Sequence, residues 1–252
     1  MCAVQPDLST AVAHLQFGRW RVLRHTLLAS TNETAALHAA SGAAWCVIVA
    51  DEQTAGRGQH GRRWLSPAGD NLLASFIVPK AAASGASLAL AVPLAICDVL
   101  DAAGIAAAGC KWPNDVLAAG AKIAGILVEA GAAFCAGVGS NVNWPATRLR
   151  QPEGGIWTSI RAESGTAHDP MHLLASLCAA LDDRLAQPAT DVLRDYQARW
   201  LDRGMNVEAN IEGSWLPGRA TGIGPDGALG VAIQDNRVVA VHSSACIRYP
   251  NT

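Results

Sequence analysis

Three glycines and three arginines fall within eight residues in the stretch Asp51-Glu-Gln-Thr-Ala-Gly-Arg-Gly-Gln-His-Gly-Arg-Arg-Trp-Leu-Ser-Pro67. Short apolar runs lie on either side, at 45–50 and 71–78, and they predict two buried strands. The connection between them is long for a compact domain, and long ordered loops usually carry function. Glycine lets the backbone approach a ligand, while arginine offers a planar fork of donors to carboxylate or phosphate oxygens. The stretch therefore predicts a flexible, anion-binding cover.

A solvated basic turn is the alternative interpretation of this loop taken alone. The sequence contains neither Gly-x-x-x-x-Gly-Lys-Ser/Thr nor Gly-x-Gly-x-x-Gly after a strand. Any anion site here is therefore neither a Walker loop nor a dinucleotide-binding fingerprint.

The composition indicates one large domain, or one domain with a small appendage, because half of the 252 residues are apolar. Net charge is −2 without a long run of one sign, so neither nucleic acid nor a membrane surface is the expected partner. Seven scattered cysteines without a Cys-x-x-Cys pair predict reduced thiols in the cytoplasm. The N-terminus shows no signal-peptide pattern, and polar residues and Pro93 break the apolar stretch 81–108, which excludes a membrane span.

Periodicity and turn residues predict alternating helices and strands up to residue 204. Residues 1–20 offer at most a short helix. The other expected elements are strands at 21–28, 45–50 and 71–78, helices at about 33–41 and 87–103, a strand near 109–117 that ends in a fixed turn at Pro113, a hairpin of 122–129 and 132–138 joined at Gly131, a loop at 151–155, and helices at 170–186 and 191–201.

The pattern changes after residue 204 to short β-like runs separated by turn residues. These runs are 207–211, 214–223, 228–233, 237–241 and 245–247. They predict a small all-β barrel, so the expected domains are 1–204 and 205–252.

Two lysines among apolar residues, Lys111 and Lys122, are costly to bury unless they meet an anion. Either lysine alone could equally be a solvated strand edge, but together with the glycine–arginine loop they favour a phosphate or carboxylate ligand. Asn114 and Asp115 suit ribose hydroxyls, a metal or a nucleophilic amine, or else form a turn. The histidines lack metal-site spacing and no Gly-x-Ser-x-Gly occurs, so neither a protein-held metal nor a serine hydrolase is expected.

Five motifs in a fixed order carry a resemblance to a known family. They are Ser30-Thr-Asn32, Gln53 to Arg62 with Trp64 and Ser66-Pro67, Lys111-Trp-Pro-Asn-Asp115, Lys122-Ile-Ala-Gly-Ile-Leu-Val-Glu129, and Gly137-Val-Gly-Ser-Asn-Val-Asn143. With these motifs the chain resembles the biotin–protein ligases, also called biotin–acetyl-CoA-carboxylase ligases. The resemblance extends from about residue 21 to the C-terminal part, where Gly222 to Leu229 matches best.

The resemblance implies an α+β fold, in which a mixed sheet flanked by helices, as in class II aminoacyl-tRNA synthetases, precedes a small SH3-like barrel. It also implies a two-step reaction. The biotin carboxylate attacks the α-phosphate of ATP to give biotinyl-5′-AMP and pyrophosphate. A lysine amine of a biotin carboxyl carrier domain then attacks the acyl-adenylate and releases AMP. ATP and Mg²⁺ are the implied cofactors, because the first step brings two anions together.

The resemblance also implies roles for individual residues. Lys122, Arg57, Lys111 and Asp115 would form the catalytic set, with Asp115 orienting the incoming amine. Biotin would be bound by Ser30, Thr31, Asn32, Gln53, Gly56, Arg57, Gly58, Gln59, Lys122 and Gly125. The nucleotide would be bound by Arg57, Arg62, Trp64, Lys111, Asn114, Lys122, Asn141 and Trp157. Core packing is the alternative role for Trp157, and helix capping the alternative for Ser30, Thr31 and Asn32.

One position departs from the family pattern. Relatives often have Gly-Arg-Gly-Arg, and here the second arginine is Gln59. A neutral amide lacks that charge, which predicts looser retention of biotinyl-AMP. About twenty residues precede the first motif without a basic excess, so a ligase-only type that does not bind operator DNA is expected. The resemblance leaves both a monomer and a homodimer open.

Two other functions compete with biotin ligation. Lipoate–protein ligases and octanoyl transferases resemble biotin ligases in fold and share a lysine placed like Lys122, and fold alone does not separate them. A non-catalytic biotin or nucleotide sensor is the third interpretation, disfavoured because both cationic motifs are intact.

Overall fold

The computed structural model describes residues 11–64, 66, 69–145, 156–234 and 237–249. The loop expected at 151–155 and the motif residue Pro67 lie outside these ranges. The elements before residue 204 are β1 (Ala13–Phe17), β2 (Trp20–Leu28), α1 (Thr31–Ala40), β3 (Cys46–Gln53), β4 (Asn71–Val78), α2 (Gly85–Ala102), β5 (Gly109–Lys111), β6 (Asp115–Ala118), β7 (Ala121–Ala130), β8 (Phe134–Asn141), α3 (Ile160–Ser164), α4 (Pro170–Ala186) and α5 (Ala189–Arg199).

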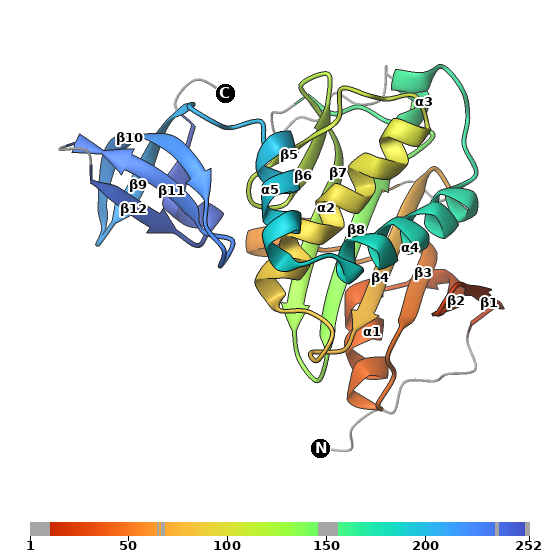
Figure 1. The fold of residues 1–252 in the computed structure, drawn as a ribbon. Coiled ribbons are helices and arrows are strands. Elements are labelled where there is room, and N and C mark those ends of the chain that lie inside the picture. The colour runs from red at the N-terminus through yellow and green to blue at the C-terminus, as the bar shows by residue number, and fades with distance from the viewer. Residues whose placement is uncertain (1–10, 65, 67–68, 146–155, 235–236, 250–252) are drawn as a thin grey trace.

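The eight strands of this part form one mixed sheet in the order β1-β2-β3-β4-β8-β7-β6-β5. Strands β2 and β3 run parallel, and the other neighbours run antiparallel. The predicted mixed sheet with flanking helices is confirmed (Figure 1).

The alternation of side chains along β3 shows how the two faces of the sheet are used. Val47 and Val49 belong to the large core cluster that contains the buried residues of α2 and α4. Cys46 and Ile48 point the other way and pack with Ala35 and Ala39 of α1. Helix α1 therefore covers one face, and α2 and α4 cover the opposite face (Figure 1).

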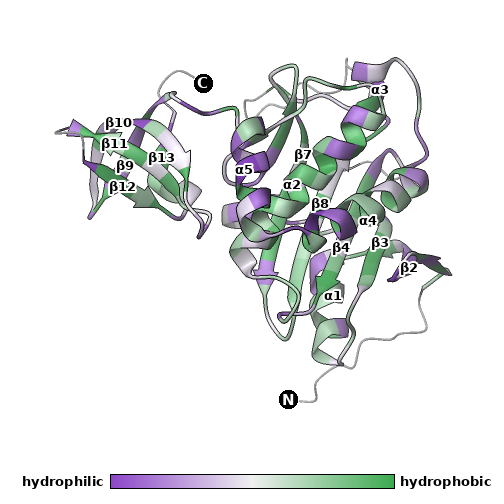
Figure 2. Cartoon of the chain, in the orientation of Figure 1, coloured by the Kyte–Doolittle hydropathy of each residue, from purple (hydrophilic) through white to green (hydrophobic). Residues whose placement is uncertain are grey.

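Helix α2 is the most apolar helix of the fold, as its green colour in Figure 2 shows. Its length and composition would suffice to cross a membrane, but 61% of it is buried inside the fold. Pro93 lies within this helix and is itself buried. The apolar character of α2 is explained by its burial as the core helix on one face of the sheet.

The C-terminal part is a separate antiparallel sheet with strand order β12-β11-β10-β9-β13. Its strands are β9 (Asn206–Ile211), β10 (Ser214–Ile223), β11 (Leu229–Ile233), β12 (Val238–Val241) and β13 (Ile247–Arg248), with the one-turn helix η5 (Ser244–Cys246) before β13. The predicted all-β part is confirmed, while its SH3-like classification and the boundary at 204/205 stay predictions.

Two local predictions were wrong. Residues 245 and 246 belong to the one-turn helix η5, where a β-like run was expected at 245–247, because the Ser243 side chain caps the turn by accepting the Ala245 amide. Residues 13–17 form strand β1, where at most a short helix was expected before residue 20. The strand exists because it pairs antiparallel with β2, with Phe17 opposite Trp20, and a single sequence does not reveal that pairing.

The strand expected near 109–117 that ends in a turn at Pro113 is confirmed as β5 and the turn at residues 112–114. The sequence did not predict that the chain after this turn forms a second strand, β6, which pairs with β5 through Lys111 and Asp115.

The connection between the two sheets runs along the edge strand β5. Trp200 forms a parallel bridge with Cys110, and the Leu201 amide donates to the Cys110 carbonyl at 2.9 Å. The carboxylate of Asp202, only 2% exposed, accepts the Trp112 amide at 2.9 Å and the Trp200 indole N–H at 3.3 Å. Burial raises the pKa of Asp202, an effect that the Trp112 amide and the charge of Lys111 partly offset.

We expect Asp202→Ala to lower the free energy of unfolding by about 1–3 kcal/mol, because buried N–H donors lose their acceptor. Asp202→Asn should cost less, since an amide oxygen can still accept the Trp112 amide. A raised pKa also means that ionisation of the carboxyl costs stability as the pH rises, and asparagine is spared that cost. Urea denaturation at pH 7 tests this, with the exposed Asp183→Ala as control. Equal loss in the two Asp202 variants would contradict the assignment.

Candidate active site

One cavity of about 1130 Å³ lies on the α1 face of the sheet and gathers nearly all of the predicted site residues. Predicted residues that line it are Ser30, Thr31, Asn32, Gln53, Arg57, Gly58, Gln59, Arg62, Trp64, Lys111, Asn114, Asp115, Lys122, Gly125 and Trp157. Gly56 and Asn141, predicted for the same site, are buried and do not line the cavity. Predicted site residues from Ser30 to Trp157 thus meet around one space, because the sheet order makes their strands adjacent.

At one end of the cavity, buried polar side chains form a connected network. Gln53 Oε1 accepts the Thr31 amide at 2.7 Å and the Thr31 hydroxyl at 3.1 Å. The Ser75 hydroxyl has two acceptors within reach, Thr31 Oγ1 at 2.8 Å and Asn32 Oδ1 at 2.6 Å. Asn32 Nδ2 donates to Glu129 at 2.7 Å. These bonds fix the donors and acceptors of the recess before a ligand arrives.

Helix capping does not explain the serine, threonine and asparagine of the first motif. Ser30 occupies the N-cap of α1 but makes no side-chain cap hydrogen bond. The side chains of Thr31 and Asn32 bond to Gln53, Ser75 and Glu129 instead. The motif therefore serves the recess.

Gly137 of β8 is required by this network. A Cβ at this position would lie 2.4 Å from Asn32 Oδ1, a distance that real contacts do not reach. Gly137 and Gly139 follow Cys135 on the same face of β8, where α1 packs against Cys135. The glycines leave the space that the side chains of the site occupy.

The other end of the cavity is cationic and aromatic. Lys122 Nζ lies 2.7 Å from Asp115 Oδ1, and the two side chains are 21% and 25% exposed. The ammonium is also 5.5 Å from the ring centroids of Trp64 and Trp157. Those two indoles stack at 5.6 Å with 30° between their planes. A half-buried cation beside flat aromatic rings can bind a group that is both anionic and aromatic.

The main chain fixes Trp157 next to Lys122. The Lys122 amide donates to the Ile156 carbonyl, and the Thr158 amide donates to the Lys122 carbonyl, both at 2.9 Å. Fully buried Asn141 donates to the Thr158 carbonyl at 2.9 Å. Asn141 therefore supports the segment that carries Trp157, and its predicted contact with the nucleotide stays a prediction.

The glycine–arginine loop folds into a small hairpin above the cavity. Arg57 and Arg63 form an antiparallel bridge, and the Gly58 amide donates to the Arg62 carbonyl at 2.8 Å. The one-turn helix η2 (Gln59–Gly61) forms the tip. At the base, Trp64 lies against Gly125 and Gly139, where added Cβ atoms would come within 2.9 and 2.4 Å of its ring.

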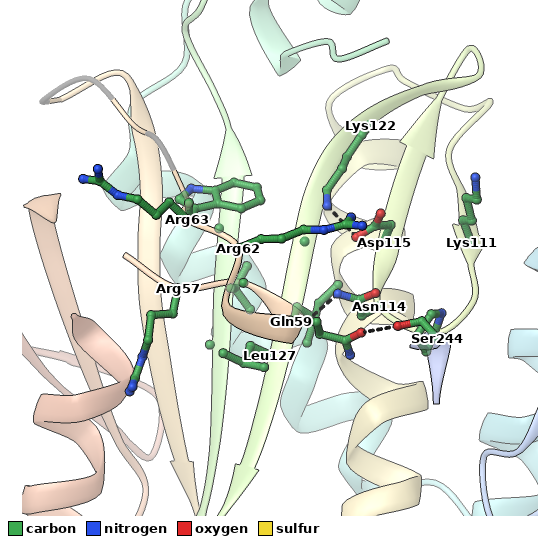
Figure 3. A pocket seen from close by; sticks show the side chains of 18 of the residues that line it. Arg57, Gln59, Arg62, Arg63, Lys111, Asn114, Asp115, Lys122, Leu127 and Ser244 are labelled. Atoms are coloured by element: carbon green, nitrogen blue, oxygen red, sulfur yellow. Dashed lines mark hydrogen bonds and ion pairs between the residues drawn. The ribbon is translucent and has the colours of Figure 1, made fainter. Parts of the chain in front are cut away.

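The arginines of the loop point in different directions (Figure 3). Arg57 extends away from Lys122 and pairs with Glu33 of α1 at 3.2 Å, with both side chains 46% exposed. Arg62 extends across the cavity on the side of Lys122 and Asp115 (Figure 3). This arrangement thus brings Arg62 to the cationic end of the cavity and places Arg57 on α1.

The predicted residues Lys111 and Asn114 stand at the cavity margin. Asn114 exchanges main-chain and side-chain hydrogen bonds with Ile126 of β7, at 2.8 and 3.2 Å. Lys111 Nζ lies 4.8 Å from the ring of Tyr249, which comes from the C-terminal part. Burial and the charge of Asp202 raise the pKa of Tyr249, so its hydroxyl stays neutral at physiological pH.

The residues of the site that sequence reasoning missed include three with polar side chains that matter for its geometry. Ser75 and Glu129 join the polar network, and Ser244 lines the cavity from the C-terminal part. Glu129 ends a recognised motif and could have been found by its position. Ser75 occupies an apolar strand, and Ser244 lies far along the chain in another sheet, so no local pattern marks either residue.

Comparison with known proteins agrees with this geometry. Residues 27–142 match the model of the Biotin/lipoate A/B protein ligase family, the class that the fold and the site define. The chain is 35% identical over 223 residues to the biotin–[acetyl-CoA-carboxylase] ligase of Mycobacterium tuberculosis, covering 83% of this chain and 82% of that protein. The biotin–[acetyl-CoA-carboxylase] ligase of Paracoccus denitrificans is 36% identical over 177 residues, which cover 66% of this chain and 73% of that protein.

A solved structure shares the fold. The biotin protein ligase of Aquifex aeolicus in complex with biotin and ATP superposes with a TM-score of 0.77 at 24% identity, covering 90% of this chain and 98% of that chain. The chain belongs to the biotin protein ligase family.

Proposed function

We propose that this chain activates biotin with ATP as biotinyl-5′-AMP and transfers the biotinyl group to a lysine of a carboxylase carrier domain. The observation that carries the proposal is a cavity with a buried polar recess at one end and Lys122 beside two stacked indoles at the other. The recess offers donors and acceptors suited to a ureido ring, and the cationic end suits an acyl-phosphate beside a purine. A valeryl chain would connect the two.

In the first step, the biotin carboxylate oxygen forms a bond to the α-phosphorus of ATP while the bond to pyrophosphate breaks. Two anions must approach, and the ammonium of Lys122 would neutralise charge on both of them. Arg62 extends to the same end, and Trp64 with Trp157 would hold the adenine by stacking. Arg57 would have to leave Glu33 to take part.

In the second step, the carrier lysine amine attacks the acyl carbon, the acyl–phosphate bond breaks and AMP leaves with that bond pair. The amine must lose a proton, and Asp115 is the carboxylate nearest to Lys122 in the cavity. We assign to Asp115 the orientation of that amine. Closure of the loop would keep water from the mixed anhydride.

Mg²⁺ would enter with the ATP phosphates, since this ion is usually bound through substrate oxygens and one or two carboxylates. Asp115 fits as such a carboxylate, because it lines the cavity and is partly exposed. The ion would supply additional charge neutralisation in the first step.

Biotin-dependent exchange of pyrophosphate into ATP tests the proposal, with lipoate and octanoate as alternative acids. Exchange with biotin alone is the expected result. Exchange with lipoate instead would assign the chain to the lipoate ligases, and biotin binding without exchange would favour a sensor. Transfer to a purified carrier domain then tests the second step.

Gln59→Arg should slow the release of biotinyl-5′-AMP from the enzyme. An arginine would add a charge beside the adenylate, and a hydrogen bond to a charged group is worth about 1.5–3 kcal/mol, or roughly 10- to 100-fold in rate. This gain exceeds the about 0.5–1.5 kcal/mol of the neutral hydrogen bond that Gln59 accepts from Ser244 and that the substitution removes. Release of labelled intermediate after removal of free substrates measures the effect. Gln59→Lys, which adds charge without the fork, is the control, and an unchanged release rate in Gln59→Arg discards the idea.

Two further parts of the proposal concern partners and location. The six described cysteines are free thiols, which supports a reducing compartment such as the cytoplasm. The absence of a strong positive charge supports a ligase that does not bind operator DNA. A specific, salt-sensitive shift of biotin-operon DNA would contradict the latter.

A further inference from the structure

The tip of the glycine–arginine loop contacts the C-terminal part of the chain. Ser244 Oγ donates to Gln59 Oε1 at 3.0 Å across 185 positions of sequence, and Figure 3 shows the two side chains meeting at the cavity margin. Both residues are half-buried and both line the cavity.

The C-terminal side of this contact is held firmly. Ser244 begins η5, whose N-cap Ser243 accepts the Ala245 amide at 3.2 Å. The chain continues directly into β13, where Ile247 is buried and pairs with Ala209 of β9. The Ser244 hydroxyl is therefore presented from a turn that the second sheet anchors.

The loop side depends more on its contacts. The hairpin is anchored at its base by Trp64 on the two glycines of the sheet, and its tip extends toward the C-terminal part. The base ion pair of Arg57 with Glu33 is solvent-exposed and contributes little to stability. The half-buried Gln59–Ser244 hydrogen bond thus joins the tip to a rigid neighbour.

We propose that Ser244 is a positioning residue of the active site, which holds the Gly-Arg loop folded over the cavity by its hydrogen bond to Gln59. The C-terminal sheet then completes the wall of the cavity and sets how often the loop opens. The consequence for catalysis, slower escape of the acyl-adenylate, rests on the proposed function, whereas the tether itself does not.

Trypsin cleavage of the ligand-free protein after Arg57, Arg62 and Arg63 measures loop opening directly. When closing is fast, cleavage follows the open population, so loss of one neutral hydrogen bond should raise the rate about two- to tenfold. We expect this rise in Ser244→Ala and in Gln59→Ala, and no further rise in the double variant, because both remove the same contact. Ser244→Thr, which keeps the hydroxyl, should remain near the wild-type rate.

Ser214→Ala, at an exposed serine at the start of β10, is the matched control and should cleave like the wild type. The proposal would be overturned if Ser244→Ala were cleaved at the wild-type rate. It would also be overturned if the cleavage rate of the double variant rose by the product of the two single-variant increases. Release of biotinyl-5′-AMP should accelerate two- to tenfold in Ser244→Ala and in Gln59→Ala. If the wild type shows no biotin-dependent exchange, the proposed function fails, while the cleavage rates still decide on the tether.

Discussion

Lys122→Ala is expected to lower biotin-dependent pyrophosphate exchange by roughly 100- to 1000-fold, the range seen when one preorganised electrostatic group is removed from an active site. Lys122 holds its ammonium 2.7 Å from Asp115 and 5.5 Å from two stacked indoles. Main-chain bonds at 2.9 Å on both sides of this residue fix its position. The cation is thus in place before the two anions approach.

Lys80→Ala is the matched control, because the chain has only two other lysines besides Lys122 and Lys80 is exposed after β4. It should exchange like the wild type. Lys122→Arg keeps the charge but moves it, and should recover only part of the activity. Full exchange in Lys122→Ala would remove this lysine from the mechanism, while equal losses in both alanine variants would indicate a non-specific effect of charge.

Gly137→Ala is expected to weaken biotin binding at least about tenfold and to destabilise the fold by about 1–3 kcal/mol through overpacking. The new methyl group would lie 2.4 Å from Asn32 Oδ1 and 2.9 Å from Asn32 Cγ. Asn32 would have to leave its bonds to Ser75 and Glu129, and the recess would lose its arrangement of donors. Calorimetric titration with biotin and thermal denaturation measure the two effects.

Gly131→Ala controls for the loss of a glycine in the same hairpin. Its added Cβ would meet only the Ala133 carbonyl, at 3.9 Å, so binding and stability should change little. If Gly137→Ala bound biotin normally, the polar network around Asn32 would not be the biotin recess. If Gly131→Ala were equally impaired, hairpin stability and not the clash would be responsible.

The sequence determined the elements whose patterns are local. The hairpin joined at Gly131, the long apolar helix and the change to short strands after residue 204 all follow from periodicity and turn residues, and the structure has them. The family resemblance carried by the five ordered motifs also predicted many of the residues that line the cavity.

Other features depended on partners that are distant in sequence. Strand β1 forms because β2 lies beside it, and residues 109–117 divide into two strands because they pair with each other. Buried Asn141 donates to the Thr158 carbonyl and so supports the segment that carries Trp157.

The sequence by itself thus determined the family, the chemistry and the residue types at the site. Only the tertiary structure decided that Arg57 rests on Glu33, that Gly137 makes room for Asn32, and that Ser244 reaches Gln59 from another sheet. The physical reason is that hydrogen bonds and steric contacts act over about 3–4 Å in space, whatever the separation along the chain. Motifs record which groups are needed, and the packing of the two sheets fixes which of them touch.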